Sequence, residues 1–111
     1  MADNDKKLYK TIVEKQGNLL YTTLSEECAE LIQACSKIQR KKFFNKDFSE
    51  EVDNLLEEIH DVEMNLFVIK EQLVREPSLN LTREDIESRL QEWHNLKIKK
   101  LEKIFLEKGE Q

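Results

Sequence analysis

The segment LSEECAELIQACSKI, residues 24–38, combines an apolar helical stripe with three glutamates in five positions. Its apolar residues alternate spacings of four and three, the pattern of a helix packed along another helix; they are Leu24, Cys28, Leu31, Cys35 and Ile38. Glu26, Glu27 and Glu30 lie within about one turn, where like charges repel by roughly 0.2–0.5 kcal/mol per pair. The segment therefore predicts a packed helix whose carboxylates are either tolerated by water or neutralised by a cation.

A second stretch repeats this pattern 31 residues later in the chain. Its apolar positions run through three heptads, namely Val52, Leu55, Ile59, Val62, Leu66, Ile69 and Leu73. With this offset Glu58 matches Glu27 and Asp61 matches Glu30, so each helix carries an acidic pair on the same flank of its apolar seam. An antiparallel hairpin of the two helices would turn the four carboxylates toward one groove. Such a group would have raised pKa values unless it held a divalent cation, and oxygen ligands suit Mg²⁺ or Mn²⁺. The alternative is two solvated acidic faces, which are common on Glu-rich helices.

Composition predicts an all-α protein of one domain over residues 1–111. The chain has 39% hydrophobic and 37% charged residues, with only two glycines and one proline. A monomer of this composition has a thin core, so we expect burial to be shared between subunits. No apolar run is long enough for a membrane span, and no signal peptide is visible, so the expected location is the cytoplasm. The formal charge of −5 argues against a nucleic-acid polymer as partner.

Helix boundary signals divide the chain into a short helix over 5–15, a core over 18–76 and a C-terminal helix over 82–108. Asp47 with Glu50 is expected to cap the third helix as a capping box, with Ser49 as a competing cap, and Thr82 with Asp85 to cap the fourth. The expected buried side of the last helix consists of Ile86, Leu90, Trp93, Leu101 and Ile104. Cys28 and Cys35 are about 10 Å apart along their helix, too far for a disulfide, and are expected to be small buried residues.

The motif EECAE at 26–30 followed by EEIHD at 57–61 resembles the EExxE…ExxD signature of the all-α nucleoside triphosphate pyrophosphohydrolases, the MazG-like family. The surrounding sequence is similar to that of the small single-domain members found in phages and bacteria. The resemblance covers Leu24 to about Leu73 and extends only loosely over the last helix.

This resemblance implies a helical hairpin that assembles as a homodimer or homotetramer with its active site near a subunit interface. It implies that Mg²⁺ holds a nucleoside triphosphate while water attacks the α-phosphorus, giving a nucleoside monophosphate and pyrophosphate. Glu27, Glu30, Glu58 and Asp61 would be the metal ligands. Glu26 would be a further ligand or would orient the attacking water.

Residues that could bind the rest of the substrate are less sharply indicated. Lys97 and Lys100, or a basic cluster in the second helix and the turn after it, could reach the phosphates; the cluster consists of Arg40, Lys41, Lys42 and Lys46. Asn65 and an aromatic ring could bind the base, and the rings are Trp93, Phe43 and Phe44. The alternative interpretations are solvated lysines and aromatic residues of a core or subunit interface. Leu20 stands where many small relatives carry a polar Gln, which leaves the base preference open.

Two further hypotheses remain beside the enzyme. The heptads of the third helix and the apolar side of the fourth could serve a non-catalytic oligomerisation or interaction module. The same fold could also act on an alarmone or a modified nucleotide.

Overall fold

The computed structural model describes residues 3–107 and consists of helices joined by short turns. The α-helices are α1 (Asp3–Gln16), α2 (Leu19–Phe43), α3 (Ser49–Val74) and α4 (Arg83–Glu102), and a π-helical segment, Lys103–Glu107, follows α4. No strand occurs within residues 3–107, so the predicted all-α class is confirmed. The expected end of the last helix at residue 108 lies outside the described residues.

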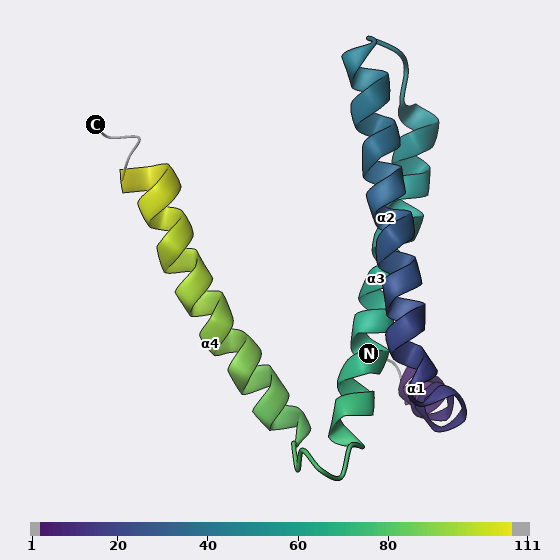
Figure 1. The fold of residues 1–111 in the computed structure, drawn as a ribbon, viewed down its shortest axis with the longest axis vertical. Helices are drawn as coiled ribbons and strands as arrows, with labels where there is room; N and C mark the ends of the chain where they lie inside the picture. The colour runs from purple at the N-terminus through teal and green to yellow at the C-terminus, as the bar shows by residue number, and fades with distance from the viewer. Residues whose placement is uncertain (1–2, 108–111) are drawn as a thin grey trace.

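Helices α2 and α3 form the predicted antiparallel hairpin and lie side by side over most of their length (Figure 1). The hairpin turns without glycine or proline. Asn45 has a φ of 55°, and the backbone N–H groups of Asn45 and Lys46 donate to the carbonyls of Lys42 and Lys41 at 3.1 and 2.8 Å. These two bonds with a left-handed residue are the Schellman ending of a helix, and Asn is the residue that tolerates this conformation best after Gly.

The two predicted capping boxes have opposite outcomes. The expected box of Asp47 and Glu50 is wrong, because α3 begins at Ser49 and its N-cap position, Phe48, makes no side-chain cap bond. The Asp47 carboxylate instead accepts from the Ser49 hydroxyl, at 2.7 Å to Oδ2, and from the backbone N–H of Ser49, which lower the pKa of Asp47. The box of Thr82 and Asp85 at the start of α4 is confirmed, with reciprocal bonds of 2.9 and 3.1 Å.

The small core lies at the open end of the hairpin, where α1 crosses α2 and α3 (Figure 1). Val13, Leu20 and Val68 come from the three helices and form its buried centre; Tyr9, Ile12 and Ile69 pack around them. Gly17, with a φ of 53°, makes the bend between α1 and α2 that permits this crossing.

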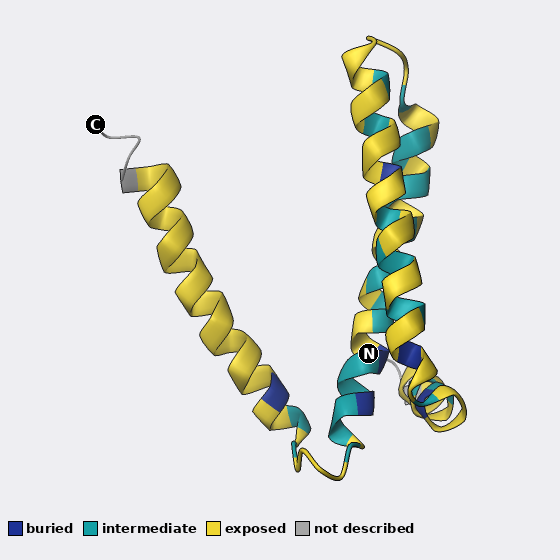
Figure 2. Ribbon diagram, in the orientation of Figure 1, coloured by how far each residue is buried: buried dark blue, intermediate teal, exposed yellow. Residues whose placement is uncertain are grey.

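Helix α4 leaves the hairpin and is almost entirely exposed along its length (Figure 2). Among the described elements, α4 contacts only α3 and the π-helical segment that follows it, and Ile86 is its one buried residue. The radius of gyration is 18.2 Å, compared with about 13 Å for a compact chain of this length. The expectation that the last helix buries one side is wrong for its other four residues, because no other element within residues 3–107 covers them in the single chain; they are Leu90, Trp93, Leu101 and Ile104.

The cysteines are both free, as expected, but only one of them is sheltered. Cys28 is half-buried and Cys35 is exposed, so the expectation that both are buried is wrong for Cys35. The reason is that Cys35 borders an open hollow, beside Ile38 and Leu55, that no other helix fills. None of the described helices is both long enough and apolar enough to span a membrane.

We expect Leu20→Ala to lower the free energy of unfolding by about 2–5 kcal/mol, because Leu20 is only 1% exposed and its removal leaves a cavity where three helices meet. Urea denaturation followed by circular dichroism measures the change. Leu19→Ala is the matched control, since its neighbour Leu19 is 67% exposed and the loss there should stay below about 1 kcal/mol. Equal losses in the two variants would contradict this placement of the core.

Candidate metal centre

Three of the four expected metal ligands meet between α2 and α3. Glu27 comes from α2, while Glu58 and Asp61 come from α3, where a spacing of three places them on one face. One carboxylate oxygen from each residue lies within 4.8 Å of the other two. All three residues are half-buried. The hairpin therefore brings together acids that are about thirty residues apart in the sequence.

Glu30 and Glu26 flank this group from the solvent side, and both are exposed. The Glu30 carboxyl group lies near those of Glu27 and Glu58 and contributes to the raised pKa of each. The charge of Glu26 is the smallest of the causes that raise the pKa of Glu27. Glu30 is thus a neighbour of both Glu27 and Glu58, whereas Glu26 is a neighbour of Glu27.

Burial and mutual repulsion disfavour the negatively charged forms of the carboxyl groups in this cluster. The pKa of Glu27 is raised, first because burial disfavours the charged form and then because Glu30 and Asp61 add negative charge. Burial is also the largest cause of the raised pKa of Glu58, followed by the hydrogen bond with Glu30 and its charge. Both glutamates therefore hold a proton more tightly than they would in water.

Two oxygen atoms of the cluster are buried without a hydrogen-bond partner, Glu27 Oε2 and Glu58 Oε2. Within residues 3–107 no lysine or arginine forms an ion pair with any of the four acids. A buried polar oxygen without a partner is costly, so the cluster calls for either a proton or a cation. The donor set consists of carboxylate oxygens alone, which fits Mg²⁺ or Mn²⁺ and does not suit soft metals.

His60 is a neighbour of the cluster that the sequence analysis did not select. Its exposed ring lies next to Asp61, with Nδ1 at 3.3 Å from Oδ1. The only sequence signal for this contact is that the two residues are adjacent in the chain.

Asn65 lies one turn beyond Asp61, as expected, and is half-buried. Its side-chain Nδ2 donates to the backbone carbonyl of Asp61 at 2.8 Å. One amide hydrogen is thereby used within α3, and the rest of the amide stays available for a role in base binding.

Trp93, Lys97 and Lys100 lie on α4 and are not brought to the acids within one chain, because α4 packs against α3 only near its own start. Lys97 Nζ lies 5.9 Å from the centroid of the Trp93 ring, so these two side chains form a pair of their own. Their assignment to the substrate stays a prediction that needs the α4 of another copy.

We expect the metal-free protein to lose stability as the pH rises above the ordinary glutamate pKa of about 4.3, because the folded state binds the Glu58 proton more tightly than the unfolded state does. At pH 7 the Glu58→Gln variant should therefore melt at a higher temperature than wild type in EDTA. Glu57→Gln is the matched control, since Glu57 is the exposed neighbour outside the cluster. Thermal unfolding between pH 4.5 and 8 measures the difference, and a Glu58→Gln variant less stable than wild type in EDTA would contradict this interpretation.

Comparison of the chain with family models, with curated proteins and with solved structures finds no match. The carboxylate geometry and the two acidic motifs are therefore the basis for a functional assignment.

Proposed function

We propose that the protein hydrolyses a nucleoside triphosphate, ribo- or deoxyribo-, to the monophosphate and pyrophosphate with Mg²⁺ or Mn²⁺. The observation that carries this proposal is the pair of buried, unpartnered carboxylate oxygens on Glu27 and Glu58, beside Asp61. They stand in the EExxE…ExxD order that resembles the MazG-like pyrophosphohydrolases. Clearing of the nucleotide pool is the role that such an activity would serve.

The charges of the cluster support this chemistry. A triphosphate brings about four negative charges, so acids alone would repel it. A divalent cation, when bound, would neutralise the phosphates and lower the pKa of a bound water. Glu27, Glu58 and Asp61 would hold the cation from the half-buried side, and Glu30 would complete the site at its edge.

Glu26 is suited to a second task, because it is exposed at the rim beside Glu27. It would orient water for attack on the α-phosphorus. The bond from the α-phosphorus to its bridging oxygen then breaks, and pyrophosphate leaves. Positioning and charge neutralisation suffice for this reaction, without a covalent nucleophile.

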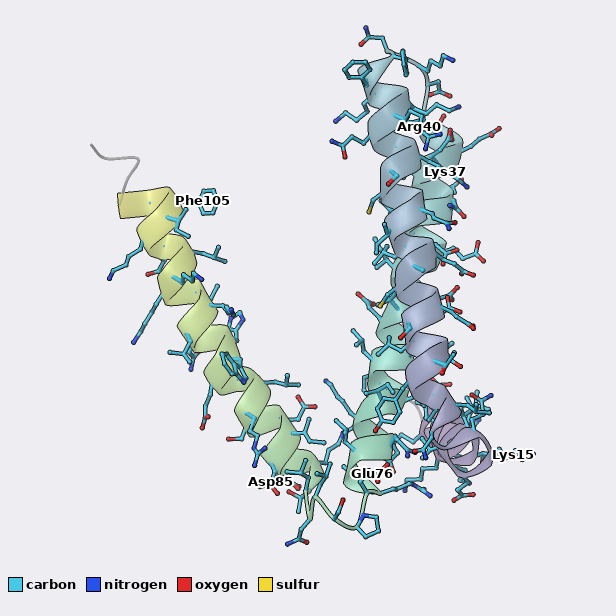
Figure 3. The ribbon with its side chains drawn as sticks, viewed as in Figure 1. Lys15, Lys37, Arg40, Glu76, Asp85 and Phe105 are labelled. Carbon is cyan, nitrogen blue, oxygen red and sulfur yellow. The ribbon has the colours of Figure 1, made fainter. Side chains whose placement is uncertain are left out.

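The exposed apolar side of α4 supports assembly as a homodimer or homotetramer. It carries large apolar side chains that a single chain leaves in solvent, among them Leu90, Trp93 and Leu101, and the π-helical segment that follows adds Ile104 and Phe105. Phe105 lies in that segment, well away from the hairpin (Figure 3). Packing against another copy would cover this surface and could bring Trp93, Lys97 and Lys100 to the acids of that copy.

The same surface also favours the second candidate, a helical interaction module without catalysis. The acidic cluster distinguishes the two candidates, because only the enzyme proposal gives a role to buried carboxylate oxygens that have no hydrogen-bond partner. An alarmone or a modified nucleotide as substrate is the remaining variant of the enzyme proposal, and a substrate screen separates it from ordinary triphosphates.

Pyrophosphate release from at least one NTP or dNTP should depend on Mg²⁺ or Mn²⁺ and fall at least about 100-fold in Asp61→Asn and in Glu30→Gln, because each removes a charge that holds the cation. A malachite-green assay with added pyrophosphatase measures the release. Glu57→Gln should keep activity within about twofold, since Glu57 is exposed and outside the cluster. If wild type leaves a full panel of nucleotides, alarmones included, intact with either metal, the enzyme proposal is wrong.

Sedimentation velocity should show a dimer or larger at micromolar concentrations, and the double variant Leu101→Glu/Ile104→Glu should shift it to a monomer. These residues are 47% and 42% exposed in one chain, so their replacement costs the single chain little. Ser88→Glu, an added charge at an exposed polar position of the same helix, is the control and should leave the assembly intact. A monomeric wild type would contradict assembly through α4.

A further inference from the structure

The turn of the hairpin holds a concentration of positive charge in an acidic protein. Residues 37–46, here called the basic tip, contain five lysine or arginine residues and no acid. The remaining thirteen cations of the chain stand against all 23 of its acids. Lys37 and Arg40 belong to the part of the basic tip that lies on α2, toward the end of the hairpin opposite α1 (Figure 3). The basic tip is thus a surface whose charge is opposite to that of the protein as a whole.

Most of the positive charges of the basic tip neither cap α2 nor form ion pairs. The last carbonyls of α2 are already capped by the backbone N–H groups of residues 44–46, so no side chain is needed there. Within residues 3–107, Lys41 is the one cation of the tip that forms an ion pair, with Glu51 at 2.9 Å. Lys37, Arg40, Lys42 and Lys46 form no ion pair among these residues. Lys42 Nζ lies 5.8 Å from the centroid of the Phe48 ring, and Lys46 also borders a hollow that is lined by Asp47, Glu50 and Glu51.

A cavity of about 240 Å³ opens on one side of the tip. Four cations, one aromatic ring and one carboxylate line it, namely Lys37, Arg40, Lys41, Lys46, Phe44 and Glu51. The three α2 cations and Phe44 follow each other at helical spacings of three, one and three, which places them on one face. Lys46 Nζ lies 6.0 Å from the centroid of the Phe44 ring. The cavity has the size and charge to take a phosphate group beside a planar ring.

Two phenylalanine rings stand out of the same turn. Phe43 is 79% exposed and Phe44 is 60% exposed, and their rings meet edge to face at 5.1 Å. The perpendicular arrangement leaves a face of Phe43 open to solvent. Phe43 lines the neighbouring hollow together with Lys42, on the same turn as the cations of the cavity. An exposed ring lowers solubility, so this placement points to a ligand with a planar apolar part and several negative charges.

We propose that the basic tip binds single-stranded nucleic acid. Unstacked bases can lie on the Phe43 ring, and the backbone phosphates can lie against Lys37, Arg40 and Lys46, which is how proteins hold single strands without reading sequence. A duplex keeps its bases inside and offers no partner to the ring. A flat anionic bilayer would not enter the cavity.

This site is separate from the acidic cluster. Lys37 is ten residues beyond Glu27, about 15 Å along α2, so the two sites do not share side chains. The proposal revises the expectation from net charge that no nucleic-acid polymer is a partner. That expectation was based on the net charge of the whole chain, whereas a single strand bound at the basic tip interacts mainly with the positive charges there.

The test is fluorescence anisotropy of a labelled 12-nucleotide oligothymidylate titrated with the full chain in EDTA, which prevents metal ions from bridging the strand to the acids. We expect a Kd in the micromolar range at 50 mM salt that weakens at least tenfold at 200 mM. Lys37→Glu/Arg40→Glu should weaken binding at least tenfold. Lys6→Glu/Lys10→Glu, the same charge change on exposed residues of α1, should stay within threefold of wild type.

Phe43→Leu tests the ring separately from the charges and should weaken oligothymidylate binding at least fivefold while leaving binding of inorganic polyphosphate unchanged. Circular dichroism melts of each variant verify the fold. Glu58→Gln should bind the strand as wild type does, so failure of the pyrophosphohydrolase proposal would leave this one standing. The proposal is overturned if wild type does not bind, if the α1 variant loses as much affinity as the tip variant, if Phe43→Leu has no effect, or if thymidine monophosphate or a duplex competes as well as the strand.

Discussion

The structure depends on the contact that α2 and α3 make across their acidic flanks. Packing the apolar seams of these helices also removes water from Glu27 and Glu58, because the acids lie beside the seam. The chain supplies no lysine or arginine partner for them within the described residues. Hairpin closure therefore creates a site of negative charge that only a proton or an external cation can relieve, and near neutral pH, where protons are scarce, a divalent ion is the better candidate. Binding of such an ion would for this reason be linked to folding through the same side chains.

The rest of the chain consists of a part that forms its own buried core and a part whose apolar side stays exposed. Around Leu20 the helices α1, α2 and α3 bury a small core, and Gly17 provides the bend that lets α1 cross. Helix α4 is held to α3 near its start, where Arg83 and Glu87 pair with Glu71 and Lys70 and where Ile86 is buried, and its remaining length is exposed. Most helical stability in proteins comes from packing of an apolar face. Among the described residues, no element covers the apolar side of α4 beyond its start.

The sequence predicted the helices and the acidic pairs well, because both follow from periodicity. Spacings of three and four located α2 and α3 to within about two residues, and the same periodicity placed Glu27, Glu58 and Asp61 on facing flanks. It failed where tertiary context decides. The alternation of apolar residues marked one side of α4 and the position of Cys35 for burial, but periodicity does not say whether another element covers that side. The capping box of Asp47 and Glu50 failed because α3 begins at Ser49, which puts Phe48 and not Asp47 at the N-cap position. The cavity of the basic tip was missed because it depends on how the turn folds, and residues such as Lys41 and Glu51 meet only in three dimensions.

The main-chain hydrogen bonds that end α2 determine which positions of the turn can vary in sequence. The turn is closed by main-chain bonds around one left-handed residue, Asn45, so most side chains there are not required for the hairpin to form. Substitutions in the turn leave the distance between the acid-bearing helices untouched, whereas inserting one residue between Glu58 and Asp61 would rotate the second acid by about 100°. The surface at this end of the hairpin can therefore vary in sequence while the carboxylates of Glu27, Glu58 and Asp61 keep their spacing.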